Sequence, residues 1–259
     1  MEDKKIVLAS SLGQGSKINK TENVIYEIND SINLTIEEGV NAYILDRTNN
    51  KDVILNVNEG AVVNYFILNS ENSKRTFNVC GELKATEINL GKTNELINAK
   101  LLKENANFNM KLLSFSNKVD SKFSFYASHE SPKTFSNIEN VGVALNGGTL
   151  LFDVTGKIFK GMNASKAAQL SRGVIMDDES NITANPILLI DEFDCFANHG
   201  AAIGKINDED LFYLMSRGLT KNEAFTLMLQ GMIKPYIDSI PLDSLKETIN
   251  SEVLNLIER

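Results

Sequence analysis

The residues best suited to chemistry lie in one segment, Pro186-Ile-Leu-Leu-Ile-Asp-Glu-Phe-Asp-Cys-Phe-Ala-Asn-His-Gly-Ala-Ala-Ile-Gly204. It begins like a buried strand, passes through acidic residues and ends in a histidine followed by glycine residues. His199 could bind a metal or carry a proton near neutral pH, although a solitary histidine is more often structural. Cys195 precedes it by four residues, and in an extended segment we expect the two side chains to point differently. The pair alone is therefore a weak signal for a metal site.

Acidic residues within and just before this segment form two short groups. They are Asp177, Asp178 and Glu179, then Asp191, Glu192 and Asp194. Carboxylates can bind a hard cation such as calcium, but these acids lack the spacing of an EF-hand loop. We expect them to form a solvated rim.

Cysteine and histidine counts exclude several classes of site. Cys80 and Cys195 lie far apart and belong to no CxxC pair, which excludes a disulfide framework and a four-cysteine zinc site. We expect two buried thiols in a reducing compartment. His129 and His199 are the only histidines, so one chain cannot build a three-histidine metal site. The loops GxGxxG and GxxxxGK[ST] and the motifs HExxH and GxSxG are also absent, which argues against the familiar nucleotide sites and hydrolases.

The composition describes an ordinary globular protein. The chain has 259 residues, of which 42% are hydrophobic and 23% charged, and a net charge of −8 that argues against nucleic-acid binding. No apolar run reaches the ~18 residues that a membrane span needs. The first residues carry no secretory signal pattern. These observations predict a cytoplasmic protein without nucleic-acid or membrane partners.

The first 204 residues favour β-structure. Short runs rich in Val, Ile, Phe, Tyr and Thr begin every 10 to 15 residues, roughly the rhythm of a sandwich, barrel or solenoid. The chain also contains 31 asparagines, which tolerate the left-handed conformation that tight corners require. Free use of asparagine codons could explain this count as well. We divide the chain into an N-terminal segment (1–30), a β-helix core (31–204) and a C-terminal helical subdomain (205–259).

From residue 205 the apolar period changes from two to 3.6, which predicts three helices. Asn207 caps the first, which ends at Arg217-Gly218. Thr220-Lys-Asn-Glu223 is a capping box that opens the second helix, and Gly231 closes it. Pro241 begins the last helix. Several large apolar residues fall outside the predicted apolar stripes, namely Phe212, Phe225, Leu229, Leu254 and Ile257. We expect core burial for most of them, with a partner surface as the alternative.

Several ordered motifs between residues 125 and 235 resemble the SufB/SufD family. Asp194-Cys-Phe-Ala-Asn-His-Gly-Ala-Ala-Ile-Gly204 and Asp208-Glu-Asp-Leu-Phe-Tyr-Leu-Met-Ser-Arg-Gly218 resemble its C-terminal signature. His129-Glu-Ser-Pro-Lys-Thr-Phe-Ser136 is similar to its H-x-x-P-x-T-x-S segment. The positions that match the family motifs are His129, Pro132, Thr134, Pro186, Gly200, Gly204 and Gly218.

This resemblance implies a fold and a function. Members form part of the SUF iron–sulfur cluster assembly scaffold, with a right-handed parallel β-helix core and a small C-terminal helical domain. They pair as homodimers or heterodimers, and their helical domain binds an ABC-type ATPase called SufC. The resemblance thus implies a scaffold rather than an enzyme, with no firmly bound cofactor but a transient cluster shared with a partner chain. In the tail, the candidates for docking the ATPase are Leu211, Phe212, Tyr213 and Arg217.

Position by position, the chain looks closer to the SufD side, or like a short divergent member. His199 matches the family histidine implicated in cluster formation there, and is the candidate cluster-assembly and metal residue. Ala197 falls where many relatives have cysteine, and Cys195 falls on their usual valine. The cysteine that SufB members carry shortly before Pro186 is missing between Ser180 and Asn185. The long N-terminal helical region of larger members is also missing.

Two other functions remain as alternatives. A carbohydrate-active or carbohydrate-binding β-helix could use paired acids such as Asp191 and Asp194. The absence of tryptophan and the aromatic content of only 7% count against it, because such grooves usually carry aromatic platforms. A cupin-like metal site is the poorer alternative, because the two histidines lie far apart in the sequence.

Overall fold

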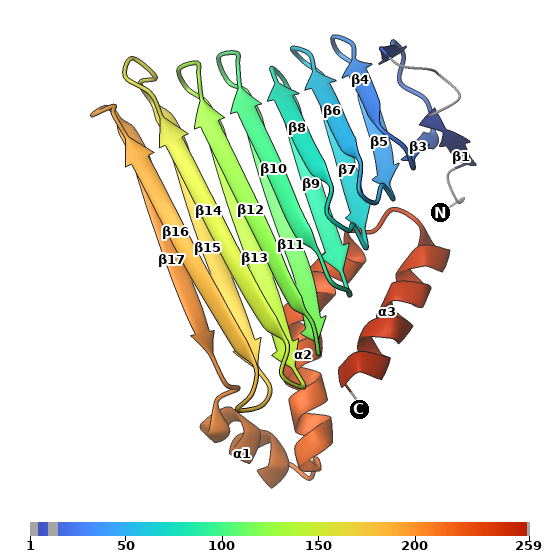
Figure 1. Ribbon diagram of the computed structural model, residues 1–259, viewed down its shortest axis with the longest axis vertical. Coiled ribbons are helices and arrows are strands. Elements are labelled where there is room, and N and C mark those ends of the chain that lie inside the picture. The colour runs from blue at the N-terminus through green and yellow to red at the C-terminus, as the bar shows by residue number, and fades with distance from the viewer. Residues whose placement is uncertain (1–4, 10–14, 258–259) are drawn as a thin grey trace.

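The computed structural model describes residues 5–9 and 15–257, and shows two parallel β-sheets followed by three helices (Figure 1). The nine-stranded sheet contains, in spatial order, β1 (Lys5–Leu8), β3 (Val24–Ile28), β5 (Asn41–Asp46), β7 (Val62–Leu68), β9 (Glu82–Asn89), β11 (Asn107–Asn117), β13 (Phe135–Leu145), β15 (Ser165–Ile175) and β17 (Cys195–Gly204). The eight-stranded sheet contains β2 (Ser16–Ile18), β4 (Ile32–Ile36), β6 (Asp52–Val57), β8 (Lys74–Val79), β10 (Asn94–Leu101), β12 (Asp120–His129), β14 (Thr149–Ile158) and β16 (Asn181–Ile190).

Successive strands alternate between the two sheets, and strands of one sheet pair in parallel with those two positions away in the chain. The prediction of a mainly β protein with C-terminal helices is confirmed, and the alternation is consistent with a β-helix. Residues 1–30, predicted as a separate segment, contribute β1, β2 and β3 to these sheets.

The corners are formed as the asparagine content suggested. In the part of the chain that the structure describes, eight non-glycine residues have positive φ, and five of them are asparagines: Asn50, Asn69, Asn72, Asn105 and Asn146. Asparagine adopts this left-handed conformation more readily than most residues, because its short side chain can bond to nearby backbone. These residues therefore turn the chain between strands without proline.

The main core lies between the two sheets, where inward side chains of both pack together. Phe77 of the eight-stranded sheet and Tyr65 of the nine-stranded sheet, for example, lie 5.2 Å apart between ring centroids. A second core lies on the outer face of the nine-stranded sheet. There, Phe66, Leu113 and Phe115 pack with helical residues such as Ile233 and Val253. The helices therefore cover one face of one sheet.

The three helices are α1 (Asp208–Ser216), α2 (Lys221–Asp238) and α3 (Asp243–Ile257). The predicted caps are confirmed: Asn207 accepts a hydrogen bond from the Glu209 backbone N–H, and Thr220 and Glu223 form the capping box. Gly218 follows α1 with a φ of +100°, a conformation that favours glycine. The last helix begins at Asp243, slightly later than predicted.

The prediction that Gly231 ends the second helix is wrong, because α2 continues through Gly231 and Pro235 to Asp238. A proline inside a helix costs about 3 kcal/mol. The continuation buries Ile233, Tyr236 and Ile237 in the outer core. Burial of each such side chain contributes about 1.5–3 kcal/mol. Tertiary packing thus outweighs the local helix-breaking signal.

Candidate functional site

The candidate site lies at the end of the two sheets formed by β16 and β17, which are the last strands of their sheets. Each pairs with only one neighbour among the described residues, so one side of each strand has no strand beside it. Several large apolar side chains are exposed on these strands and in the turn between them: Ile187, Leu189, Phe193, Phe196 and Ile203. Both edges and these side chains together make one uncovered end, which we call the open end.

His199 occupies the last position of an inward-facing column. Register partners along the nine-stranded sheet are Tyr65, Ala85, Met110, Ile138, Gln169 and then His199. The side chains before His199 are buried, whereas His199 is exposed. Its side chain therefore continues the interior column at the open end, where none of the described strands covers it.

Cys195 and Ala197 lie on the same inward-facing side of β17 as His199. Their register partners Ser165 and Ala167 are both buried. The expectation that Cys195 and His199 point differently is wrong, because residues four apart in a strand share a face. Among the described residues, however, no three His, Cys, Asp or Glu side chains are placed to hold a metal ion.

Both thiols are half-buried, which corrects the expectation that they are buried. Cys195 begins the uncovered strand, and its Sγ donates to the Glu192 carbonyl oxygen at 3.2 Å. Burial raises the thiol pKa at both cysteines, and Glu192 and Asp194 raise that of Cys195 further. Neither thiol therefore has the lowered pKa of an activated nucleophile.

Gln169 is a site residue that the sequence did not single out. It lies on β15 directly beside His199 in register and is 5% exposed. Its Nε2 donates to the Ile187 carbonyl oxygen at 3.2 Å, which links the two sheets just below the open end. Its Oε1 is buried and has no hydrogen-bond partner among the described residues. The signal is a glutamine in an inward-facing position of a strand, and that position can be recognised only once the register is known.

The motif at His129 has a structural explanation. The His129 ring is fully buried, with Nδ1 at 2.7 Å from Thr134 Oγ1 and Nε2 at 2.9 Å from Ser136 Oγ. Pro132 lies in the short turn between β12 and β13 that brings these three side chains together. The H-x-x-P-x-T-x-S segment therefore forms a buried hydrogen-bonded corner, two strands away from β17 in the nine-stranded sheet.

The family-motif positions on β16 and β17 are a proline and two glycines, which carry no reactive side chain. Pro186 lies on β16, which pairs only with β14 among the described strands, and proline fits an edge strand because it has no N–H to donate. Gly200 and Gly204 lie on β17, where a Cβ would make an ordinary contact with Leu170 or meet open space. Neither glycine is required by close packing within this chain.

The predicted docking residues of α1 are divided between core and surface. Leu211 is buried, whereas Phe212 is 74% and Tyr213 56% exposed. The Arg217 guanidinium lies 5.2 Å from the centroid of the Tyr213 ring and donates to its hydroxyl at 3.3 Å. Phe212 is thus accessible to a partner beside the stacked Tyr213–Arg217 pair. Leu211 is not accessible, because it is buried.

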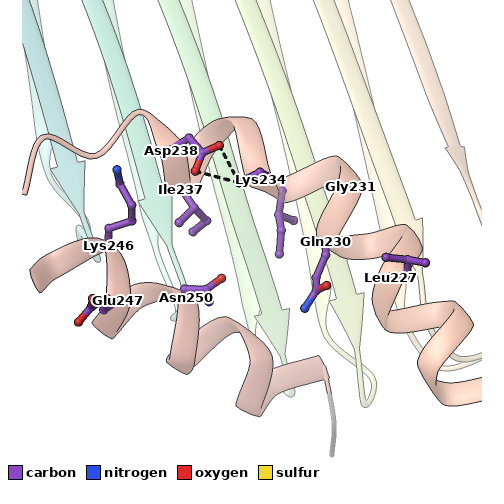
Figure 2. A pocket seen from close by; sticks show the side chains of 10 residues that line it. Leu227, Gln230, Gly231, Lys234, Ile237, Asp238, Lys246, Glu247 and Asn250 are labelled. Carbon is purple, nitrogen blue, oxygen red and sulfur yellow. Dashed lines mark hydrogen bonds and ion pairs between the residues drawn. The ribbon is translucent and has the colours of Figure 1, made fainter. Parts of the chain in front are cut away.

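A groove of about 520 Å³ runs between α2 and α3 (Figure 2). Leu227, Gln230 and Gly231 line the α2 side, and Lys246, Glu247 and Asn250 line the α3 side. Lys234 and Asp238 form an ion pair of 3.0 Å at one wall. Leu227 is 48% exposed although it lies in an apolar stripe of α2. The groove therefore offers an apolar floor with charges of both signs at its rim.

Charged residues also form a network inside the main core, which the sequence did not reveal. Arg75 is fully buried, and its Nε donates to Asp46 at 2.7 Å while its Nη1 donates to Glu95. Tyr65 donates to the same Asp46 carboxylate. Glu87 is fully buried nearby, and neither of its carboxyl oxygens has a hydrogen-bond partner among the described residues. Burial and the neighbouring Glu95 raise the pKa of Glu87 well above its usual value.

Comparison with known families and proteins identifies relatives. Residues 12–232 match the family model described as SUF system FeS cluster assembly, SufBD core domain. Bacillus subtilis (strain 168) has an iron–sulfur cluster assembly protein SufD that is 36% identical over 118 residues, covering 46% of this chain and 26% of that protein. An iron–sulfur cluster assembly SufBD family protein of Mycobacterium tuberculosis (strain ATCC 25618 / H37Rv) is 32% identical over 115 residues, covering 44% of this chain and 14% of that protein. The matched part is thus about a quarter of the Bacillus protein and about a seventh of the Mycobacterium protein.

Proposed function

Because this chain belongs to the SufB/SufD family of the SUF iron–sulfur cluster assembly system, we propose that it is a non-enzymatic scaffold subunit of such an assembly complex. The observation that carries the proposal is the position of His199. It ends an interior column at the open end of the sheets, where a second chain can approach it. The iron–sulfur cluster is then cargo that the complex builds rather than a resident cofactor.

The open end is the proposed pairing surface. The free edges of β16 and β17 carry unpaired backbone groups, which a strand of another chain can bond. Exposed apolar residues such as Ile187, Leu189 and Phe196 surround these edges, and such residues are typical of a covered surface. A SufB/SufD-like partner, either a second copy or a relative, would extend a right-handed β-helix across this end.

A cluster assembled there would need ligands from both chains. Thiolates are the usual ligands of iron–sulfur clusters, and this chain has only Cys80, between β8 and β9, and Cys195, at the start of β17. The thiol pKa of Cys195 is raised rather than lowered. His199 is therefore the proposed ligand or proton carrier of this chain, and the partner supplies the thiolates.

The helices are the proposed docking region for an ABC-type ATPase similar to SufC. Two exposed features support this assignment. Phe212 projects from α1 beside the Tyr213–Arg217 stack, and aromatic and arginine side chains commonly anchor interfaces. The groove between α2 and α3 offers a second contact surface with a mixed-charge rim.

The carbohydrate alternative has no support from the site. Asp191 forms an ion pair of 2.5 Å with Lys157, and both Asp191 and Asp194 are exposed at the turn between β16 and β17.

Within the described residues, no helix is long and apolar enough to cross a membrane. We place the proposed complex in the cytoplasm, where cysteines such as Cys80 and Cys195 stay reduced.

A complementation assay for cluster assembly tests the proposal. His199→Ala should abolish assembly and leave the melting temperature unchanged, because the side chain is exposed. Asn198→Ala is the matched control, since it alters an exposed neighbour on the outward-facing side of the same strand. Full assembly by the His199→Ala variant, or loss of its fold, would contradict the role proposed for this histidine.

A further inference from the structure

Gln169 and His199 are neighbours on the same inward-facing side of adjacent strands. Parallel register partners lie about 4.8 Å apart, so their side chains run next to each other. Gln169 is buried, whereas His199 is exposed with no strand beyond it among the described residues. His199 therefore has rotational freedom, and Gln169 does not.

The orientation of the Gln169 amide is set by the opposite sheet. Its Nε2 donates to the Ile187 carbonyl oxygen at 3.2 Å. This bond fixes which side of the planar amide carries Oε1. That oxygen is buried without a partner among the described residues. An acceptor left in this state costs about 1–3 kcal/mol, which favours any nearby donor that can reach it.

Gly156 makes room for this arrangement. It lies on β14 across the interior, and a Cβ built there would lie 3.0 Å from Gln169 Nε2 and 3.1 Å from Leu188 Cδ2. Any larger residue would push against the amide or against Leu188. The glycine thus allows Gln169 to reach the backbone of β16.

We propose that Gln169 is a positioning residue for His199, in which its fixed Oε1 accepts the N–H of one imidazole nitrogen. The hydrogen bond made by one ring nitrogen decides which nitrogen is left with a lone pair. The other nitrogen then faces the open end, ready for a metal ion or a proton. Histidines that bind metals commonly donate their second N–H to such an acceptor. That the free nitrogen serves iron–sulfur chemistry rests on the function proposed above, whereas the positioning itself does not.

The test measures the tautomer ratio of the His199 ring in the full chain by long-range ¹H–¹⁵N NMR near pH 8.5. With only two histidines, His199→Ala assigns the signals, and His129 serves as an internal reference. Gln169→Met keeps the side-chain length but removes the acceptor, and should change the ratio roughly 2- to 10-fold, the range that one net hydrogen bond of about 0.5–1.5 kcal/mol is worth. Gln169→Glu retains an acceptor oxygen and should keep the same major tautomer.

Two further variants separate positioning from general disturbance of the core. Gly156→Ala changes neither residue of the pair, yet should shift the ratio in the same direction as Gln169→Met. Asn140→Leu is the matched control, because Asn140 is also buried with an unpartnered amide oxygen but lies two strands away from β17. An unchanged ratio in Gln169→Met would overturn the proposal whatever Gly156→Ala shows, as would an equal shift in Asn140→Leu.

Assembly activity of the same variants keeps the two proposals apart. If the ratio shifts in Gln169→Met and assembly falls, both the positioning and the role of His199 are supported. If the ratio shifts and assembly is unchanged, the positioning stands, and His199→Ala in the same assay decides whether His199 serves assembly. If the ratio does not shift, the positioning is wrong whatever the assembly assay shows.

Discussion

His129 Nδ1 lies 2.7 Å from Thr134 Oγ1, and both side chains are buried at the corner between β12 and β13. The second ring nitrogen contacts Ser136 Oγ at 2.9 Å, so both nitrogens have hydroxyl partners. Hydroxyl groups can donate or accept, which suits a neutral imidazole with one donor and one acceptor nitrogen. Burial without a carboxylate partner disfavours the charged ring, so this corner favours an uncharged histidine.

Stability should fall as the pH drops from about 6.5 to 4. Burial lowers the pKa of His129 to about 4 in the folded chain, whereas the usual value of 6.5 applies after unfolding. The unfolded state therefore binds a proton first, and below this window the folded state loses about 3 kcal/mol relative to neutral pH. Urea unfolding of the wild type and of His129→Gln at several pH values checks this. The variant should be less stable at pH 7 but should lose less on acidification, and equal losses in both would contradict the prediction.

Glu87 should have the opposite effect on stability. Its pKa is raised well above 4.5 by burial and by Glu95, so the folded chain holds a proton that the unfolded chain releases. Stability should therefore decrease as the pH rises above about 4.5, by up to about 1.4 kcal/mol per pH unit. Glu87→Gln cannot ionise and should gain stability over the wild type between pH 5 and 8. Thermal unfolding of both proteins at pH 5 and at pH 8 measures this. A stability difference between variant and wild type that is the same at both pH values would show that Glu87 ionises freely in the fold.

The charged groups around Glu87 interact with one another, so a change at one of them affects the others. Arg75 bonds to Asp46 and Glu95, and Tyr65 bonds to Asp46. A control variant should therefore keep this network intact. Asn140→Leu meets that need, because it removes a buried polar side chain on β13 that belongs to a different group. Its effect on stability should not vary with pH.

Much of the fold could be predicted from the sequence, because strand composition and helix caps are local signals. β6 and β7, for example, are short runs of the composition that predicted strands, and Asn207 and Thr220 cap helices as expected. The repeat itself was harder to detect. Register partners lie 21 residues apart between Ile44 and Tyr65 but 31 apart between Ile138 and Gln169, so no fixed period marks it.

The site was less accessible to sequence analysis, because it depends on register. His199 was found through a motif, but its neighbour Gln169 is 30 residues away and becomes adjacent only when β15 and β17 pair. Arg75, Asp46 and Glu95 are also separated by 20 residues or more. The extension of α2 past Gly231 depends on contacts with the sheet. The local sequence contains only the helix-breaking residues and gives no sign of these contacts.

The thiols should contribute little to assembly. Cys80 and Cys195 are half-buried, and burial raises the pKa of both thiols, which lowers the thiolate fraction at neutral pH. Cys80→Ser and Cys195→Ser should each cost about 1 kcal/mol or less and keep assembly close to the wild-type level. The serine hydroxyl can replace the Cys195 bond to the Glu192 carbonyl. A severe assembly defect with an unchanged melting temperature would identify the mutated cysteine as a ligand.

We expect docking of the proposed ATPase to depend on exposed side chains of the helices. Point variants of these side chains test this better than deletion of all three helices. Removal of residues 205–259 would uncover Phe66, Leu113 and Phe115 on the nine-stranded sheet, so a deletion would destabilise the chain as well as remove the surface. Point variants avoid this problem. Phe212→Ala and Leu227→Asp change the α1 surface and the α2–α3 groove separately, and both residues are exposed.

Phe212→Ala should weaken binding of a SufC-like ATPase by about 2 kcal/mol, roughly 30-fold, if the ring fills a desolvated pocket of the partner. Arg217→Ala should have a smaller effect, because the guanidinium is already engaged with the ring and hydroxyl of Tyr213 within the chain. Leu96→Ser is the matched control: Leu96 is 36% exposed on β10 of the eight-stranded sheet, which the helices do not cover. Isothermal titration with the purified ATPase measures all four variants, including Leu227→Asp in the groove. Unchanged affinity in Phe212→Ala, Arg217→Ala and Leu227→Asp would show that the helices do not form the docking surface and serve only to cover the sheet.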